Sequence, residues 1–296
     1  MLQHVAVPRE NPDLDGLACA FAFAEFLRAV GRGARGFVAG EPDPEALFVA
    51  RRLGVATLGP DPRPGEPVVL VDASDLRGMP SSLDPESVVE VIDHRMHHRA
   101  AALFPNAVLC IEPVGAAATL VAERFARHEL TPSARTAMLL QAAILSNTQL
   151  LRGSITTDRD HAAFHALAAV APLPAGFVDA QLDARRQAIL ADLGAAISRE
   201  RKDFDHGDGA YILSQLEFAG ARNYTAVCLP LLARLGPRAI LNLVDVEAGT
   251  SAVLVPDPET RAWVAALAGL CFTGPLALCP QILLRKQIVA RIDGKA

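Results

Sequence analysis

The feature that most constrains the fold is a regular alternation of short apolar segments and helical patterns in the first half of the chain. Residues 5–7, 37–39, 68–71, 88–92 and 107–111 are predicted strands, and helical patterns cover residues 14–30, 44–53, 116–128, 133–150 and 158–171. Strands that are apolar at nearly every position are covered on both faces of their sheet. The alternation therefore predicts an α/β fold with a doubly wound parallel sheet.

The pattern changes in the second half of the chain. Residues 178–204 are predicted to form one long charged helix. Strands are predicted at residues 211–216, 239–246, 251–255 and 282–292, with helices at 225–235 and 259–270. We interpret this part as a smaller α/β domain with a mixed sheet. The expected division is a first domain over residues 1–186, a linker within the long helix at 187–193, and a second domain over 194–296, which suits a chain of 296 residues.

Composition excludes several classes of protein. Hydrophobic residues make up 51% of the chain and the net charge is −5, so we expect a packed core and no general nucleic-acid binding. The five cysteines form no C-x-x-C pair and indicate buried thiols in a reducing compartment. Residues 262–284 are uncharged and long enough to span a bilayer, but Gly274-Pro275 favours a helix, a turn and a strand. No signal peptide is evident at the start, and we expect a cytoplasmic protein without a membrane span.

Acidic residues follow three of the predicted strands. They are Asp13 and Asp15 after the first strand, Asp72 after residues 68–71, and Asp93 with His94 after residues 88–92. The carboxyl ends of parallel strands form the ligand edge of such a sheet. Carboxylates gathered there need a counter-ion, and oxygen ligands with one imidazole suit Mn²⁺ or Mg²⁺. The alternative is that each aspartate only caps a helix or turn.

Six short segments in order carry a family resemblance. They are Asn11–Asp15, Val71-Asp72, Val91–His94, Gly115–Thr119, Ala143–Asn147 and Arg285–Gln287. Together they resemble the DHH phosphoesterase superfamily over nearly the whole chain. The closest types are the manganese-dependent (family II) inorganic pyrophosphatases and the prune-type exopolyphosphatases, with a C-terminal domain like DHHA2.

The resemblance implies a role for each matching residue. Metal ligands would be Asp13, Asp15, Asp72 and His94, with Asp72 bridging two ions, and Asp93 would orient His94. Asp13, Asp72, Asp93 and Arg95 are the expected catalytic group. The implied reaction is attack of a metal-bound water on the phosphoanhydride bond of pyrophosphate or short polyphosphate. Arg285 and Lys286, on the predicted last strand, would neutralise the substrate phosphate.

The chain departs from the family pattern at three site positions. Arg9 and Arg95 stand where the pyrophosphatases have histidines, and Asn147 stands where they have a ligand aspartate. Three carboxylates and one arginine leave a charge of −2, which matches one divalent ion. We therefore hypothesise that Arg9 takes the place of the first metal, and that one ion remains near Asp15, Asp72 and His94. Asn147 would offer a neutral oxygen.

Other residues are expected to bind the phosphate. Arg95 cannot transfer a proton at neutral pH, so it is expected to bind an anion together with Arg9; a surface salt bridge is the alternative. Thr119 and the free N–H groups of residues 115–119 could hold a phosphate oxygen at a helix start.

Three further signals are set aside. Residues 31–36 match G-x-G-x-x-G but follow a helix, the reverse of the dinucleotide-binding context. His161 and His165 are one helical turn apart without an H-E-x-x-H motif. His97 and His98 are interpreted as part of a solvated loop.

The leading expectation is a metal-dependent phosphoesterase holding one or two ions of Mn²⁺ or Mg²⁺, with one ion favoured. Its partner is a phosphate-containing small molecule, and apolar edge strands would suit a homodimer. The competing hypothesis is a catalytically weakened or inactive relative that binds a phosphorylated ligand or a protein partner. A nucleotidase acting on short oligonucleotides is a third hypothesis, which the aromatic content of 5% does not favour.

Overall fold

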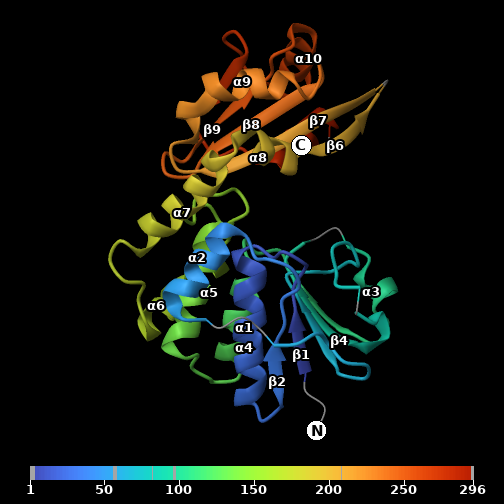
Figure 1. Ribbon diagram of the computed structural model, residues 1–296, viewed down its shortest axis with the longest axis vertical. Helices are drawn as coiled ribbons and strands as arrows, with labels where there is room; N and C mark the ends of the chain where they lie inside the picture. Colours follow the sequence, from blue (N-terminus) through green and yellow to red (C-terminus); the bar gives the residue numbers. More distant parts are fainter. Residues whose placement is uncertain (1–3, 56–58, 82, 96–97, 208, 295–296) are drawn as a thin grey trace. The chain divides into compact units, whose positions relative to one another are not determined.

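A computed structural model of the chain describes residues 4–55, 59–81, 83–95, 98–207 and 209–294. The chain divides into two compact units, each with its own sheet (Figure 1). The first comprises Met1–Leu151 and Ile155–Gln181, and the second comprises Arg152–Ser154 and Leu182–Ala296. The boundary at residue 186 and the linker at 187–193 remain predictions.

The first unit contains the predicted parallel sheet. Its five strands are β1 (His4–Val7), β2 (Ala34–Gly36), β3 (Val68–Val71), β4 (Val88–Asp93) and β5 (Val108–Ile111). They lie in the order β2-β1-β3-β4-β5, and every neighbouring pair is parallel. The predicted second strand at residues 37–39 is wrong by three positions. Pairing with β1 sets this edge strand, and Phe37 instead places its side chain in the core at 5% exposure.

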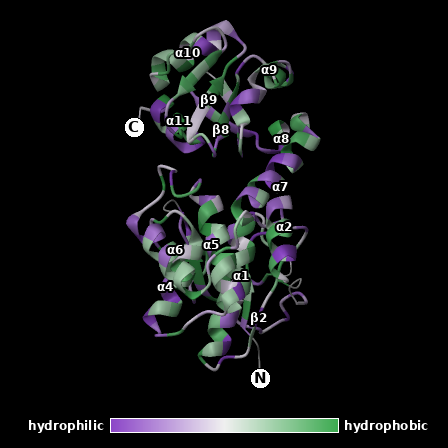
Figure 2. Cartoon of the chain, turned by 90° about the vertical axis from the view of Figure 1, so that its left-hand side faces the viewer, coloured by the Kyte–Doolittle hydropathy of each residue, from purple (hydrophilic) through white to green (hydrophobic). Residues whose placement is uncertain are grey.

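Helices cover one face of this sheet. They are α1 (Leu14–Ala29), α2 (Pro44–Leu53), α4 (Ala117–Arg127), α5 (Ala134–Asn147) and α6 (Asp158–Val170). Figure 2 shows hydrophobic residues along α1 and α5, whose side chains pack with β3 residues such as Val69 and Val71 in the largest core. The other face, with Val5 and Leu70, is covered by Phe37, Phe104 and the short helix α3 (Ala100–Leu103). Both faces are thus covered, as the apolar strands predict.

The second unit contains the predicted mixed sheet. Its strands are β6 (Lys202–His206), β7 (Gly209–Phe218), β8 (Ala239–Asp245), β9 (Thr250–Leu254) and β10 (Leu276–Cys279). β7 and β8 are parallel, and the other neighbours are antiparallel. Helices α8 (Leu193–Arg199) and α9 (Thr225–Ala233) pack on one face, and α10 (Pro258–Ala268) and α11 (Arg285–Ile292) pack on the other.

The single long helix predicted at residues 178–204 is wrong. It is divided into α7 (Phe177–Ala191) and α8, and residues 202–206 form strand β6. Asp192 separates the two helices because its side chain accepts a hydrogen bond from Ala195 N at 2.8 Å, which starts a new helix. The polar composition of α7, visible in Figure 2, agrees with its burial of only Phe177 and Gln181.

The strand predicted at residues 282–292 is also wrong. Residues 285–292 form α11, in which Ile288 and Ile292 are buried one turn apart. Gln287 caps this helix by accepting a hydrogen bond from Leu284 N at 2.8 Å. The uncharged residues 262–284 form the predicted helix, turn and strand, namely α10, a turn at Gly274 and β10. Within the described ranges, no helix is long and apolar enough to cross a membrane.

Candidate metal centre

The ends of three adjacent strands bring the predicted site residues together. β3 lies between β1 and β4. Asp15 follows β1, Asp72 follows β3 and His94 follows β4. Asp72 has a left-handed backbone (φ +52°), and its N–H donates to the carbonyl of Ile92 at 2.8 Å. The site thus lies at the carboxyl edge of the sheet, where the chain order reverses between β1 and β3.

Asp15, Asp72 and His94 converge on one point. One ligand atom from each lies within 4.8 Å of the others, and no second group of this kind occurs among the described residues. The side chains of Asp15 and Asp72 are only 2% and 5% exposed. Two buried carboxylates beside an imidazole form a set that suits a divalent cation.

The orientation of His94 supports a cation at this point. Its Nδ1 lies 3.1 Å from the carbonyl oxygen of Val114, which can only accept, so Nδ1 carries the hydrogen and Nε2 of the neutral ring carries a lone pair. Nε2 faces Oδ1 of Asp72 at 3.6 Å, and this buried Oδ1 accepts no hydrogen bond, although Nη2 of Arg95 lies 3.2 Å from it as an ion pair. Two acceptors face each other. Both can bind one ion, because two metal–ligand bonds of about 2.0–2.2 Å can span that separation.

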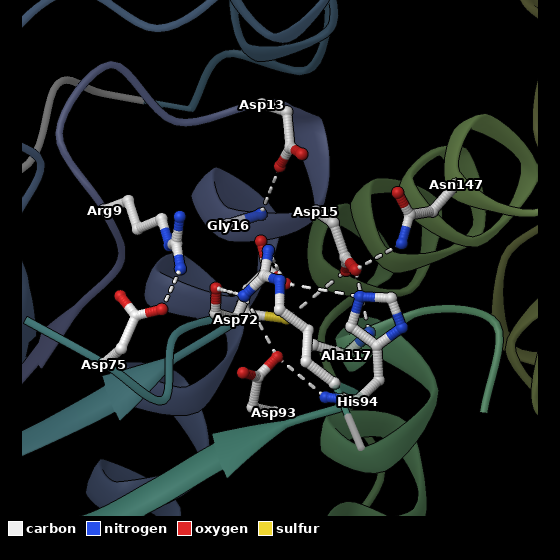
Figure 3. Close-up of polar contacts among 12 residues, drawn as sticks. Arg9, Asp13, Asp15, Gly16, Asp72, Asp75, Asp93, His94, Ala117 and Asn147 are labelled. Atoms are coloured by element: carbon white, nitrogen blue, oxygen red, sulfur yellow. Dashed lines mark hydrogen bonds and ion pairs between the residues drawn. The ribbon is translucent and has the colours of Figure 1, made fainter. Parts of the chain in front are cut away.

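Asp15 also holds the start of α4. Its carboxylate accepts hydrogen bonds from Ala117 N and Ala118 N, both at 2.8 Å, and from the Sγ of Cys19 at 3.6 Å. Asn147 Nδ2 donates to it at 3.1 Å (Figure 3). Asp15 therefore caps a helix, as the alternative interpretation of the aspartates proposed, but the helix is α4, which is distant from Asp15 in the sequence. A metal ligated by Asp15 must displace one of the side-chain donors.

Asn147 turns its amide nitrogen toward Asp15. The same Nδ2 donates to the carbonyl of Gly115 at 3.0 Å, and this acceptor fixes the orientation of the amide. The neutral oxygen predicted to replace the ligand aspartate therefore does not face Asp15. Asn147 instead joins α5 to the segment that precedes α4.

Burial changes the charge state of the two inner carboxylates. It acts with the charge of Asp13 to raise the pKa of Asp15 from 3.8 to about 7, against the hydrogen bonds from Ala118 and Ala117. Burial also raises the pKa of Asp72 well above its ordinary value, although the Arg95 guanidinium opposes this. A nearby cation would therefore stabilise the charged form of both carboxylates.

Arg9 does not lie where we expect it. Its Nη2 donates to Oδ2 of Asp75 at 2.9 Å, and Figure 3 shows this pair apart from Asp15 and His94. The hypothesis that Arg9 takes the place of the first metal is therefore wrong. Asp75 could not be predicted as the partner of Arg9, because a single aspartate in a loop is common.

Arg95 lies against the inner carboxylates instead. Its Nη2 is 3.2 Å from Oδ1 of Asp72, and its Nη1 is 3.1 Å from Oδ1 of Asp93 and donates to the carbonyl of Asp72 at 2.5 Å. Burial lowers the pKa of Arg95, but the charges of Asp72 and Asp93 outweigh it and raise this pKa overall. The guanidinium is engaged by the site itself, so neither free anion binding nor a surface salt bridge describes it.

Asp93 orients Arg95 rather than the ring of His94. Its Oδ1 accepts hydrogen bonds from His94 N at 2.8 Å and from Arg95, while Val114 holds the imidazole. Asp93 is fully buried. The prediction that Asp93 orients the His94 side chain is thus wrong, because the ring points to the segment before α4.

Asp13 and Thr119 have structural partners, one near in sequence and one distant. Asp13 is exposed and caps α1 by accepting from Gly16 N at 3.0 Å. Thr119 is buried, and its hydroxyl donates to Oδ1 of Asp160 at 2.6 Å. Asp160 also accepts from Gly115 N, so the start of α4 is occupied by the carboxylates of Asp15 and Asp160. The Thr119 hydroxyl, which we predicted to bind phosphate, therefore already donates its hydrogen to Asp160. The Thr157-x-x-Asp160 capping-box spacing could have revealed Asp160.

In the second unit, Arg285 and Lys286 form the first turn of α11 rather than part of a strand. Nη1 of Arg285 donates to the carbonyl of Glu200 at 2.7 Å, and Lys286 is exposed. Burial lowers the pKa of both groups. Two cations at a helix start are unfavourable unless an anion is near.

The set-aside signals that lie in the described ranges are not part of this cluster. His161 and His165 are exposed on α6, and residues 31–36 form a turn and strand β2. His97 lies outside the described residues, and His98 is exposed next to α3.

The chain has the fold of the family II inorganic pyrophosphatases. A Methanococcus jannaschii protein assigned to that family superposes with a TM-score of 0.73, at 22% identity over 99% of both chains. No family model matches the chain.

Similar curated proteins are also named as inorganic pyrophosphatases. An Exiguobacterium protein described as a "probable manganese-dependent inorganic pyrophosphatase" is 25% identical over 94% of this chain and 93% of its own length. A Shouchella clausii protein with the same description is 32% identical over 55% of this chain and 53% of its own length. In this and the other strongest alignments, the chain spans about half the length of the relatives. The predicted resemblance is confirmed.

Proposed function

We propose that the chain is a metal-dependent hydrolase of phosphoanhydride bonds, with pyrophosphate as the first substrate and short polyphosphate as the second. The observation that carries the proposal is the pair of facing acceptors, His94 Nε2 and Asp72 Oδ1, which lie 3.6 Å apart in a buried acidic cluster. The similarity to proteins named manganese-dependent inorganic pyrophosphatase supports the choice of Mn²⁺ and of pyrophosphate.

Asp72 and His94 would hold the ion, with Asp15 as a third ligand once Asn147 or Cys19 turns away. A bound divalent cation supplies an acidified water and neutralises phosphate charge. Asp93 and Arg95 keep the Asp72 carboxylate in place, and Asp13 lies at the exposed rim of the site. Asp13 can accept a proton from water there.

We also propose that the start of α11 binds phosphate. The Lys286 side chain makes no ion pair or hydrogen bond among the described residues. Arg285 and Lys286 form the first turn of an eight-residue helix, at the positive end of its dipole, where the N–H of Arg285 donates to Gln215 Oε1. An anion satisfies all three sources of positive charge at once. The position of these residues on a helix, rather than on a strand, favours this role.

A homodimer through β5 and a reducing cytoplasmic location complete the proposal. β5 is an edge of the first sheet, and Val108 and Leu109 on it are 67% and 36% exposed. An uncovered apolar edge strand is a common site of pairing with a second copy.

The five cysteines form no disulfide, which suits a reducing compartment.

The competing function is binding of a phosphorylated ligand or protein partner without turnover. One observation favours it: Arg95 is already engaged by the site carboxylates and Thr119 by Asp160, so neither is open to substrate. Release of phosphate from pyrophosphate, tripolyphosphate and a short oligonucleotide, measured with Mn²⁺ and with Mg²⁺, separates the hypotheses. Turnover of pyrophosphate that is lost in Asp72→Ala supports the hydrolase. Tight pyrophosphate binding without turnover supports the alternative.

A further inference from the structure

The site offers ligands for one ion rather than two. Asp15, Asp72 and His94 are the one group of three ligands among the described residues. On the side of Asp13, the family histidine is replaced by Arg9, and Arg9 is paired with Asp75. A second ion would therefore find only carboxylates from Asp13 and Asp72.

A guanidinium already contacts the carboxylate that two ions would share. Arg95 places Nη2 at 3.2 Å from Oδ1 of Asp72, the same oxygen that His94 Nε2 faces at 3.6 Å. Its other end nitrogen is held by Asp93 at 3.1 Å and by the carbonyl of Asp72. These contacts fix the guanidinium in the cluster, and its charge cannot be removed near neutral pH.

Charge counting agrees with one ion. Asp13, Asp15, Asp72 and Asp93 contribute −4 when ionised, and Arg95 contributes +1, so the cluster carries −3. The Arg9–Asp75 pair cancels itself. One divalent ion brings the total to −1, whereas a second would reverse the sign of the cluster and would have two ligands at most.

We propose that Arg95 is a built-in second cation, so that the chain binds one divalent ion and Arg95 limits the affinity for that ion through Asp72. This inference rests on the metal site of the proposed function. It makes Arg95 a positioning residue, because it acts on the ion through a shared carboxylate.

The test is titration of the metal-free chain with Mn²⁺ by calorimetry, with elemental analysis of the loaded protein. The wild type should bind one ion per chain. Arg95→Gln should tighten binding of this ion by about tenfold or more, because a positive charge next to its ligand is removed. Arg95→Lys keeps the charge and should stay within about threefold of the wild type.

Arg9→Gln is the matched control, since it removes an arginine paired outside the cluster and should leave the Mn²⁺ affinity unchanged. Two tightly bound ions in the wild type overturn the proposal, as does an Arg95→Gln variant with unchanged or weaker affinity. If Arg95→Gln does not fold, the ion count of the wild type and the affinity of Arg95→Lys still decide. Metal counting needs no substrate, so one ion without phosphate release refutes the proposed function alone, and hydrolysis with two ions refutes this inference alone.

Discussion

Nε2 of His94 faces Oδ1 of Asp72 at 3.6 Å, with no hydrogen between them in the neutral ring, because Nδ1 carries the proton toward Val114. A cation removes the repulsion between these two acceptors. Asp72→Asn keeps the shape and loses the charge, so it should weaken Mn²⁺ binding by about 100-fold.

Calorimetry measures this change, and Asp75→Asn is its control because the Asp75 carboxylate binds the Arg9 guanidinium and the N–H of Arg77 rather than the site residues. Asp75→Asn should bind Mn²⁺ like the wild type. Equal weakening in both variants would show a general effect of acidic charge rather than ligation by Asp72.

The raised pKa of Asp15 makes stability depend on pH. Burial and the charge of Asp13 raise this pKa from 3.8 to about 7 in the native state. Between about pH 4 and pH 7 the native state keeps the Asp15 proton while the unfolded chain loses it, so the stability that Asp15 contributes falls as pH rises. A pKa difference of roughly three units corresponds to a change of about 4 kcal/mol in the free energy of unfolding.

Urea unfolding at pH 5 and pH 7.5 with a chelator measures this loss. Asp15→Asn should show a smaller loss, because only the contribution of Asp72, whose pKa is also raised by burial, remains. Mn²⁺ should restore stability at pH 7.5, because an ion favours the charged carboxylate. A wild type whose pH dependence matches that of Asp15→Asn contradicts the assignment.

Asp160 is expected to stabilise the fold rather than take part in chemistry. This buried carboxylate accepts hydrogen bonds from Gly115 N, from the Thr119 hydroxyl, and from both the N–H and the hydroxyl of Thr157. Asp160→Asn should lower the free energy of unfolding by about 3 kcal/mol, since charge-assisted bonds are lost and polar groups are left buried.

Thermal or urea unfolding provides the measurement. Asp158→Asn, an exposed change in the first turn of the same helix, should cost less than about 0.5 kcal/mol. Thr119→Val should also lower stability but leave the KM for pyrophosphate unchanged. A raised KM for pyrophosphate in Thr119→Val would indicate that Thr119 contacts the substrate.

Lys286 is expected to act on the substrate without affecting the fold. It is exposed at the start of α11, so Lys286→Gln should leave unfolding unchanged and raise the KM for pyrophosphate by about tenfold. Arg199→Gln changes an exposed arginine at the end of α8 and serves as the control. The same KM in both variants would exclude a phosphate site at α11.

The sequence was sufficient for the sheet and for its acidic edge, because apolar strands and the aspartates after them are local signals. Asp15, Asp72 and His94 meet because β1, β3 and β4 are neighbours, which follows from the parallel order. The partners of the arginines could not be predicted in the same way. Arg9 and Arg95 are long side chains whose directions depend on loops around Asp75 and Asp93.

Residues 282–292 show a second limit. Ile282-Leu283-Leu284 resembles a strand, but the cap from Gln287 and the spacing of Ile288 and Ile292 produce a helix. Thr119 shows a third, since its hydroxyl is taken by Asp160, which lies 41 residues away in the chain. Contacts of this kind depend on tertiary packing rather than on local pattern.

The most direct test of the metal site is a crystal structure of the chain grown with Mn²⁺, with anomalous data collected at the manganese edge. The account predicts one strong peak bonded to Oδ1 of Asp72 and Nε2 of His94, with the Arg95 guanidinium still against Asp72. No peak at these atoms, or a peak bound elsewhere in the chain, would contradict it.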